Sequence, residues 1–299
     1  MDTCTIPGGL YPVMLTALKI DKSIDWRGMP HLVDWYLANE VNGLFAVCGS
    51  SEMYALTPTE RLQLARFIVQ RVNGRVPVVA TGTFGGRIEA QAEFIQQMAD
   101  TGVDAVVVLP NQLAGVNDSD DILRHHFERL MALTEPIALG LYECPSPYHR
   151  LLSPELLRWA GESKRFVYHK DTSCNLDCIR AKIDAVDGTP LQIFNAHTPT
   201  ALDSLRYGAA GLSPVAANYY PELFVKLCQL ARNDIEQAIR LQKQLVELEG
   251  MRGTSYPIGA KFFLQQRGLS IETMCRGSHT AIADADKGRL MELLKAVSI

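Results

Sequence analysis

Two hydrophobic patterns alternate along most of this chain. Short apolar runs rich in β-branched residues occur eight times, at 10–16, 41–47, 76–81, 104–109, 137–142, 165–170, 191–195 and 211–216. Between them lie segments whose apolar residues are spaced three and four apart, clearest at 25–39, 58–71, 87–101 and 118–133. The first pattern predicts buried strands and the second predicts amphipathic helices.

The order of these elements predicts the fold. Strands that alternate with helices form parallel sheets, and eight such repeats in about 220 residues favour a closed barrel over an open sheet. Helix starts agree, since Thr57 and Ser153 are capping residues that each precede a proline suited to a first helical turn. No Gly-x-Gly-x-x-Gly motif follows the first strand, which weakens a dinucleotide-binding alternative. The predicted fold class is therefore α/β, a (β/α)8 TIM barrel.

The alternation stops after residue 221. The segments 222–232, 234–250, 257–267 and 284–297 all have helical periodicity. We therefore expect residues 1–221 to form the barrel with the active site, and residues 222–299 to form a C-terminal helical appendage. No low-complexity linker separates the two parts, so the appendage is expected to pack on the barrel.

Composition narrows the possible partners. The 299 residues carry a net charge of −4 and no basic run, whereas sequence-independent nucleic-acid binding needs clustered Lys and Arg. No stretch approaches the roughly 20 apolar residues that span a bilayer, and the N-terminus has no signal-peptide features. Seven cysteines without paired short spacings favour free thiols in a reducing compartment. We therefore expect a cytoplasmic protein that binds neither nucleic acid nor a membrane.

Polar residues that close the predicted strands are the candidates for chemistry, because barrel active sites lie at the C-terminal ends of the strands. Lys170 closes the sixth strand, and burial there would disfavour the ammonium and leave an amine able to attack a carbonyl. Taken alone, such a residue is more often a strand-end lysine that extends to solvent. Tyr142 closes the neighbouring strand at the same height, where it would act as a general acid and base or simply fill space.

The turn after the second strand offers a further binding feature. Gly49, Ser50 and Ser51 supply two hydroxyls and several backbone N–H groups, a nest suited to a carboxylate, although an ordinary turn has the same composition. We interpret the following Glu52 as a loop anchor rather than a catalytic acid.

Metal and other nucleophile sites have weaker support. Adjacent residues on a helix point apart, so His125 and His126 do not share a metal. Cys174 and Cys178, with His169 or His197, would be a possible zinc set, but free cysteines are more often core residues. Neither Gly-x-Ser-x-Gly nor His-Glu-x-x-His is present.

Several motifs, taken in order, resemble the N-acetylneuraminate lyase and dihydrodipicolinate synthase superfamily of class I, pyruvate-type aldolases. Cys-Gly-Ser-Ser-Glu at 48–52 is similar to the family's Gly-Thr-Thr-Gly-Glu, and Tyr-Glu-Cys-Pro at 142–145 to its Tyr-Asn-x-Pro. Val-Tyr-His-Lys-Asp-Thr at 167–172 is similar to its Schiff-base lysine motif. Further matches lie at 10–18, 152–156, 208–213 with Asn218 and Pro221, and 257–261, so the resemblance covers essentially the whole chain.

This resemblance implies a role for each residue. Lys170 would form an imine with a 2-oxo acid, Tyr142 would move protons, and the Gly49–Ser50 turn would bind the carboxylate. It implies a homotetramer built as a dimer of dimers and a reaction without metal or organic cofactor. Further candidate substrate-binding residues are Ser51 of the same turn, Gln112, His197 and Ser213.

Three positions depart from the family members that make dihydrodipicolinate. Gly49 stands where they have threonine, Gln112 where they have a tyrosine contributed across a subunit interface, and Pro147 where they have an arginine. The proton relay would then run through Ser50 or water, and the carboxylate of aspartate semialdehyde would lack its cation. His197 would contact a distal hydroxyl or carboxylate, or be held by backbone as a loop residue.

Our hypothesis is a lyase that forms a Schiff base through Lys170. It would perform aldol cleavage, condensation or dehydration on a substrate of the 2-keto-3-deoxy sugar acid type. One alternative is dihydrodipicolinate synthase proper, acting on pyruvate and aspartate semialdehyde. Another is a non-catalytic relative that binds 2-oxo acids.

Overall fold

The strands form one parallel sheet, as the apolar runs predicted. The computed structural model describes residues 5–277 and 281–297. Within them the strands are β1 (Gly9–Leu10), β2 (Leu44–Ala46), β3 (Val78–Thr81), β4 (Ala105–Val108), β5 (Leu139–Tyr142), β6 (Phe166–Asp171), β7 (Gln192–Asn195) and β8 (Gly211–Leu212). Neighbours pair in sequence order from β2 to β8, and β8 pairs with β1.

The segment after β1 closes the sheet into a barrel. Val13 forms a parallel bridge with Phe45 of β2, the Met14 N–H donates to the Phe45 carbonyl at 2.9 Å, and the Phe45 N–H donates to Pro12 at 3.0 Å. The predicted strand 10–16 is shorter in the structure because Pro12 has no N–H for the ladder. The (β/α)8 prediction is confirmed.

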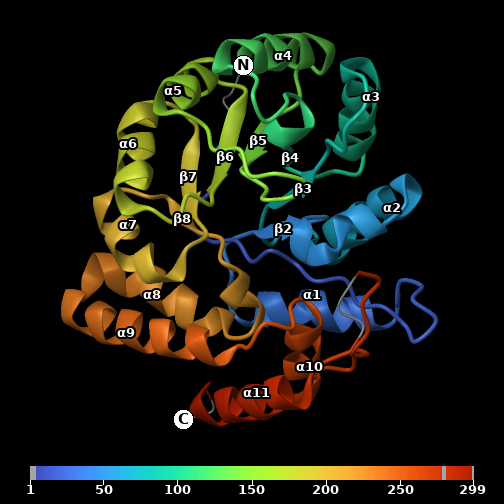
Figure 1. The fold of residues 1–299 in the computed structure, drawn as a ribbon, viewed down its shortest axis with the longest axis vertical. Helices are drawn as coiled ribbons and strands as arrows, with labels where there is room; N and C mark the ends of the chain where they lie inside the picture. Colours follow the sequence, from blue (N-terminus) through green and yellow to red (C-terminus); the bar gives the residue numbers. More distant parts are fainter. Residues whose placement is uncertain (1–4, 278–280, 298–299) are drawn as a thin grey trace.

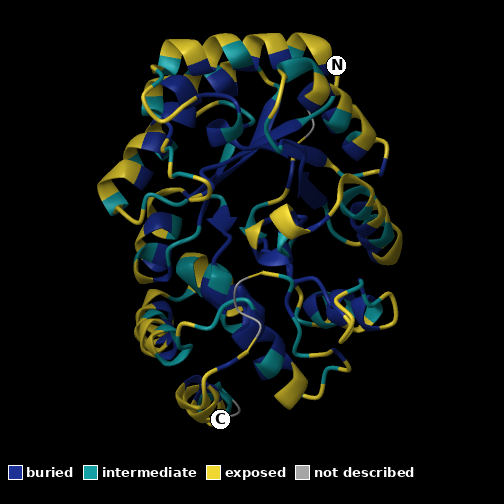
Figure 2. Cartoon of the chain, turned by 45° about the vertical axis from the view of Figure 1, so that its right-hand side comes forward, coloured by how far each residue is buried: buried dark blue, intermediate teal, exposed yellow. Residues whose placement is uncertain are grey.

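Helices surround the barrel as a ring (Figure 1). They are α1 (Gly28–Ala38), α2 (Pro58–Val72), α3 (Ile88–Ala99), α4 (Asp120–Leu133), α5 (Pro154–Glu162), α6 (Leu176–Val186), α7 (Ala201–Tyr207) and α8 (Pro221–Asn233). Side-chain caps start several of them: Thr57 and Ser153 accept the N–H groups of Glu60 and Leu156. Figure 2 shows buried strands inside and exposed residues on the outer faces of the helices.

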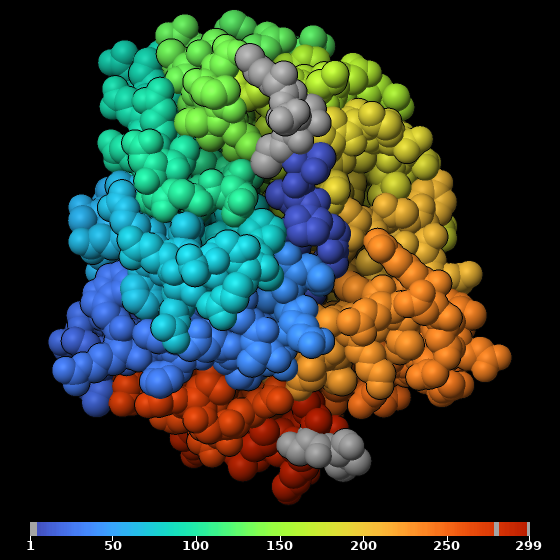
Figure 3. Space-filling view, turned by 180° about the vertical axis from the view of Figure 1, so that it is seen from behind, coloured from blue at the N-terminus to red at the C-terminus, as the bar shows by residue number. Residues whose placement is uncertain are grey.

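Three further helices follow the ring, and their bounds agree with the predicted segments. These are α9 (Ile235–Met251), α10 (Ile258–Gln266) and α11 (Asp284–Val297). Figure 3 shows the orange and red C-terminal part lying directly against the blue N-terminal part. The preceding helix α8 contacts β1 and β8 and so closes the ring. The division of the chain at 221/222 stays a prediction.

Aromatic rings fill the interior of the barrel. The rings of Tyr11 and Phe194, and those of Tyr168 and Phe194, have centroids 4.7 Å apart. Phe45 meets Tyr168 edge to face at 5.7 Å. Because side chains alternate along a strand, Lys170 lies on the same face as Tyr168, one layer nearer the C-terminal end of the barrel. The aromatic layer is therefore the floor beneath Lys170.

Within the described residues, no helix combines the length and apolarity needed to cross a membrane.

Candidate active site

Lys170 and Tyr142 meet at the C-terminal end of the barrel. They are direct partners across β5 and β6, and the Lys170 Nζ lies 4.5 Å from the centre of the Tyr142 ring. The lysine is only 3% exposed, so its side chain does not extend to solvent. Burial lowers the pKa of Lys170 to about 8, although the thiols of Cys48 and Cys144 oppose the shift. The lowered pKa therefore increases the neutral, nucleophilic fraction of the amine near neutral pH.

The Tyr142 hydroxyl lies over the turn that follows β2. A Cβ placed on Gly49 would be 3.7 Å from that hydroxyl. Burial is the main cause that raises the pKa of Tyr142 well above its usual value. The phenol therefore stays protonated and is able to donate a proton beside the amine.

Unusual backbone geometry shapes this turn. Val47 has φ 48° and Glu52 has φ 58°, at either end of the short helical turn Gly49–Ser51. A positive φ is costly for a β-branched residue such as Val47, and strain of this kind concentrates at functional sites. Glu52 is held by the Lys261 amine at 2.7 Å and by the Arg276 N–H at 2.6 Å. The interpretation of Glu52 as a loop anchor is therefore confirmed.

The two serines of the turn have different environments. The Ser51 hydroxyl donates to the Met14 carbonyl at 2.6 Å and accepts the Cys48 N–H at 3.1 Å. Its own N–H donates to the Cys48 carbonyl at 3.0 Å, so both polar groups of Ser51 hold the turn together. The Ser50 hydroxyl instead accepts a hydrogen bond from the Tyr256 hydroxyl at 2.5 Å.

Sequence reasoning missed Tyr256 as a site residue. It lies between α9 and α10, and Asn218 donates to its hydroxyl at 2.7 Å. Asn218 follows β8, and both residues lie in or beside segments that carried the family resemblance. Tyr256 precedes the Pro-Ile-Gly-Ala-Lys motif directly, which was the available signal. No periodicity indicated that this segment reaches back to the barrel mouth.

The remaining predicted residues make other contacts. The Gln112 amide donates to the Tyr54 hydroxyl at 3.3 Å. His197 Nδ1 lies 3.1 Å from the Thr200 hydroxyl, which holds the ring within its own loop. The Ser213 hydroxyl donates to the Tyr11 carbonyl at 2.7 Å, inside the core. The structure thus brings Lys170 and Tyr142 together beside the turn that carries Gly49 and Ser50. The side chains of Ser51, Gln112, His197 and Ser213 make other contacts.

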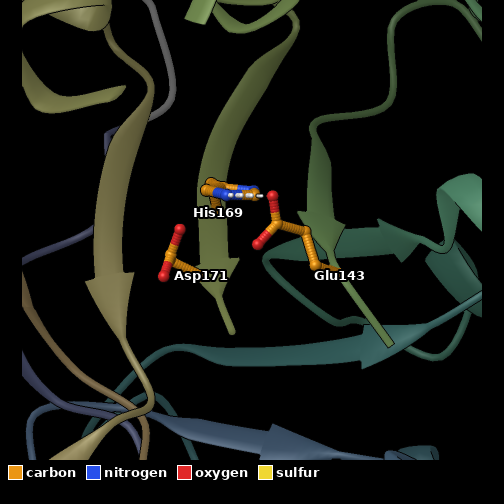
Figure 4. A group of neighbouring side chains, drawn as sticks. All are labelled: Glu143, His169 and Asp171. Atoms are coloured by element: carbon orange, nitrogen blue, oxygen red, sulfur yellow. Dashed lines mark ion pairs between the residues drawn. The ribbon is translucent and has the colours of Figure 1, made fainter. Parts of the chain in front are cut away.

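A buried ionic cluster lies behind the strands that carry Lys170 and Tyr142. Glu143 and Asp171 follow those residues in sequence and point the other way, toward His169 (Figure 4). The Lys182 amine of α6 lies 2.5 Å from Glu143 and 2.6 Å from Asp171, and it supplies the positive charge between the two carboxylates. His169 Nε2 is 3.7 Å from Glu143, and burial lowers the pKa of His169 to about 3, so the ring is neutral.

Within the described residues, the zinc site suggested from the sequence does not assemble. His169 lies with the carboxylates, while Cys174 and Cys178 are exposed rather than core residues as the sequence had led us to expect. Glu143, His169 and Asp171 have the spacing of metal ligands, but the Lys182 ammonium already pairs with both carboxylates.

Comparisons with known proteins give matches over nearly the whole chain. The sequence model of the "Dihydrodipicolinate synthetase family" matches residues 7–297. The chain is 27% identical over 263 residues to 4-hydroxy-tetrahydrodipicolinate synthase of Cellvibrio japonicus, covering 87% of this chain and 89% of that one. It is similar to the crystal structure of the chloride-inhibited dihydrodipicolinate synthase from Acinetobacter baumannii complexed with pyruvate. That structure has a TM-score of 0.88 and 26% identity, with 99% of this chain and 100% of that chain covered.

A third comparison concerns the fold alone. YagE, a prophage protein of Escherichia coli K12 solved in complex with pyruvate, has a TM-score of 0.88 at 24% identity. The match covers 97% of this chain and 98% of that one.

Proposed function

Because the chain belongs to the dihydrodipicolinate synthetase family and is thus a lyase-type enzyme, we propose that Lys170 forms an imine with the keto carbon of a 2-oxo acid. The observation that carries this proposal is the buried amine of Lys170, with its pKa lowered to about 8, beside the protonated Tyr142 phenol. A neutral amine and a nearby acid are the two groups that imine formation needs.

The steps balance without a further reactant. The Lys170 nitrogen bonds to the keto carbon, and the two protons of the neutral amine move by way of Tyr142 to the carbonyl oxygen, which leaves as water as the imine forms. In aldol cleavage, Tyr142 protonates the imine nitrogen, the bond between C3 and C4 breaks, and its electron pair forms an enamine with the protonated imine as the sink. The C4 hydroxyl gives its proton to the Tyr142 phenolate as an aldehyde departs. Tyr142 then protonates C3, and one water molecule hydrolyses the imine, which releases pyruvate, restores the amine and returns the proton to Tyr142.

For the substrate we propose a 2-keto-3-deoxy sugar acid. Gly49 and Pro147 provide neither the hydroxyl nor the cation expected for aspartate semialdehyde. Arg150, three residues after Pro147, donates to Asp120 at 3.1 Å and to the Gly115 carbonyl at 2.8 Å, so it does not replace that cation. A neutral polyol chain suits a mouth in which neither position 147 nor position 150 offers a free cation.

The alternative within the same chemistry is dihydrodipicolinate synthase proper. The names of several similar proteins favour it, including those of Cellvibrio japonicus and Acinetobacter baumannii. A pyruvate-release screen over keto-deoxy sugar acids, neuraminate and 4-hydroxy-2-oxoglutarate separates the two. Faster condensation of pyruvate with aspartate semialdehyde than any cleavage would overturn our choice of substrate.

Borohydride trapping tests the imine itself. Incubation with pyruvate and borohydride should add one reduced pyruvate to the protein mass, and Lys170→Ala should abolish the addition. Lys164→Ala is the matched control, because this lysine is exposed and lies just before β6. An unchanged mass of the native protein, or labelling that survives Lys170→Ala, would support the non-catalytic alternative.

We also propose a cytoplasmic homotetramer that works without metal or organic cofactor. The six described cysteines are free thiols, which fits a reducing compartment. The tetramer and the absence of a cofactor rest on the family resemblance. Sedimentation gives the assembly state, and dialysis against a chelator should leave pyruvate labelling unchanged.

A further inference from the structure

We propose that Tyr256 is a positioning residue that fixes the Ser50 hydroxyl as a hydrogen-bond donor to the carboxylate of the 2-oxo acid. This inference rests on the proposed function and deepens it. Its basis is a chain of hydrogen bonds whose direction is set by backbone groups far from the substrate.

The chain begins at Asn218, whose amide has only one consistent orientation. Its Nδ2 donates to the Val13 carbonyl at 2.8 Å, and a carbonyl only accepts. The opposite side of the amide, Oδ1, therefore faces Tyr36, whose hydroxyl donates to it at 2.5 Å. The Tyr36 hydroxyl accepts the Leu15 N–H at 3.4 Å, so its proton is left for Asn218.

This orientation determines the direction of the next two bonds. The second hydrogen on Asn218 Nδ2 donates to the Tyr256 hydroxyl oxygen at 2.7 Å. Tyr256 must then direct its own proton to the Ser50 oxygen, 2.5 Å away. Ser50 is the acceptor in that bond, so its own hydroxyl proton is available to donate. Within the described part of the chain, that proton has no acceptor.

Ser50 belongs to the turn that faces the reacting groups. It directly follows Gly49, whose Cβ position is 3.7 Å from the Tyr142 hydroxyl, and Tyr142 contacts Lys170. Ser50 is 5% exposed, and in such a poorly solvated site a fixed donor interacts strongly with an anion. Burial raises the pKa of Tyr256 well above its usual value, so the phenol remains a donor throughout the working pH range.

The test compares ligands with and without a carboxylate. Tyr256→Phe should raise the pyruvate concentration for half-maximal borohydride labelling about three- to tenfold, because the Ser50 proton loses its fixed direction. Ser50→Ala should raise it about tenfold or more, as expected for a lost hydrogen bond to a charged group. The maximal labelling at saturating pyruvate should change little in Tyr256→Phe. Labelling by hydroxyacetone, a ketone without a carboxylate, should not respond to Tyr256→Phe.

A double variant and a matched control complete the experiment. In the Ser50→Ala background, Tyr256→Phe should have no additional effect, because Tyr256 acts through Ser50. Tyr220→Phe is the control, since its hydroxyl is also buried but has no hydrogen-bond partner in the described structure. Additive effects, or equal losses with pyruvate and hydroxyacetone, would show that Tyr256 is merely structural. If the native protein is not labelled by pyruvate, the proposed function itself fails; normal native labelling with an unaffected Tyr256→Phe overturns only this inference.

Discussion

The reactivity of Lys170 depends on what surrounds its amine. Tyr142 and Phe45 offer ring faces 4.5 and 6.0 Å from Nζ, and no carboxylate is paired with it in the described structure. The neighbouring carboxylates of Glu143 and Asp171 instead bind Lys182. Lys170 and Lys182 thus differ in their ion pairing. Lys170 faces the barrel interior, whereas Lys182 meets the carboxylates on the outer side of the strands.

This difference predicts the pH dependence of labelling. Since the pKa of Lys170 is lowered to about 8, the neutral amine increases as the pH rises through that value. The initial rate of imine formation with pyruvate should therefore increase between about pH 6 and 8 and level off above about 9. Rapid-quench borohydride labelling across this range measures it. A midpoint above pH 10, near that of an ordinary lysine, would contradict the prediction.

Gly49 provides a second prediction about a single residue. Among the described residues other than its chain neighbours, a Cβ here would meet only the Tyr142 hydroxyl within 4 Å, at the ordinary contact distance of 3.7 Å. At Gly43, a Cβ would lie 2.1 Å from the Tyr11 ring. Gly49→Ala should therefore leave the melting temperature nearly unchanged, whereas Gly43→Ala should lower it by many degrees or prevent folding. Thermal unfolding of both variants measures these melting temperatures. A large loss in Gly49→Ala would contradict the prediction that position 49 has room for a side chain.

At the scale of elements, α6 joins β5 and β6 through the buried cluster. The Lys182 amine binds Glu143 and Asp171 while Glu143 accepts the N–H groups of Leu152 at 2.8 Å and Thr172 at 3.0 Å. These contacts hold the ends of the two strands at the level of Tyr142 and Lys170. The cluster thus supports the site from the side of β5 and β6 that faces α6.

Removing the cation should therefore be costly. Lys182→Met leaves two neighbouring carboxylates buried without a counter-charge, and we expect a loss of about 3–5 kcal/mol of unfolding free energy. Lys287→Met is the control, because its pair with Asp284 is exposed at the surface and should be worth less than about 1 kcal/mol. Urea denaturation gives both values. Equal effects of the two changes would show that the cluster does not support the strands.

Helices and strands were the features of the structure that the sequence predicted best. Apolar runs placed the strands, helical periodicity placed the C-terminal helices, and the strand ends located Lys170 and Tyr142. Contacts such as those of Ser51 and Ser213 were not predictable, because they depend on how a turn or a core layer closes on distant backbone. Tyr256 escaped for the same reason: nothing in its local pattern records the position of Ser50, 206 residues earlier.

At the scale of the whole molecule, ion pairs join the C-terminal segment to the region that follows β2. Lys261 of α10 is fully buried and pairs with Glu52, and Arg276 donates to Glu60 of α2 at 2.6 Å. The C-terminal segment thereby fixes the turn that carries Gly49 and Ser50. The appendage is part of the support of the site.

This support predicts a coupled loss. Lys261→Met leaves Glu52 without its cation, so we expect about 3–5 kcal/mol of destabilisation and weaker pyruvate labelling. Adding Glu52→Gln should restore part of the stability, since the buried charge is then gone. Lys295→Met, in an exposed pair of α11, is the control. Chemical denaturation and labelling together test this, and an unaffected labelling curve in a destabilised Lys261→Met would separate the appendage from the site.

The bond from Tyr256 to Ser50 also has a consequence for synthesis of the protein. A ribosome releases the chain from its N-terminus, so all eight strands emerge before residue 256 does. A nascent chain that has already formed its barrel holds Lys170 and Tyr142 but not the partner that orients Ser50. If the chain has the function proposed above, the carboxylate donor of such a nascent chain is still unset, so recognition of the 2-oxo acid is among the last properties that the growing chain acquires.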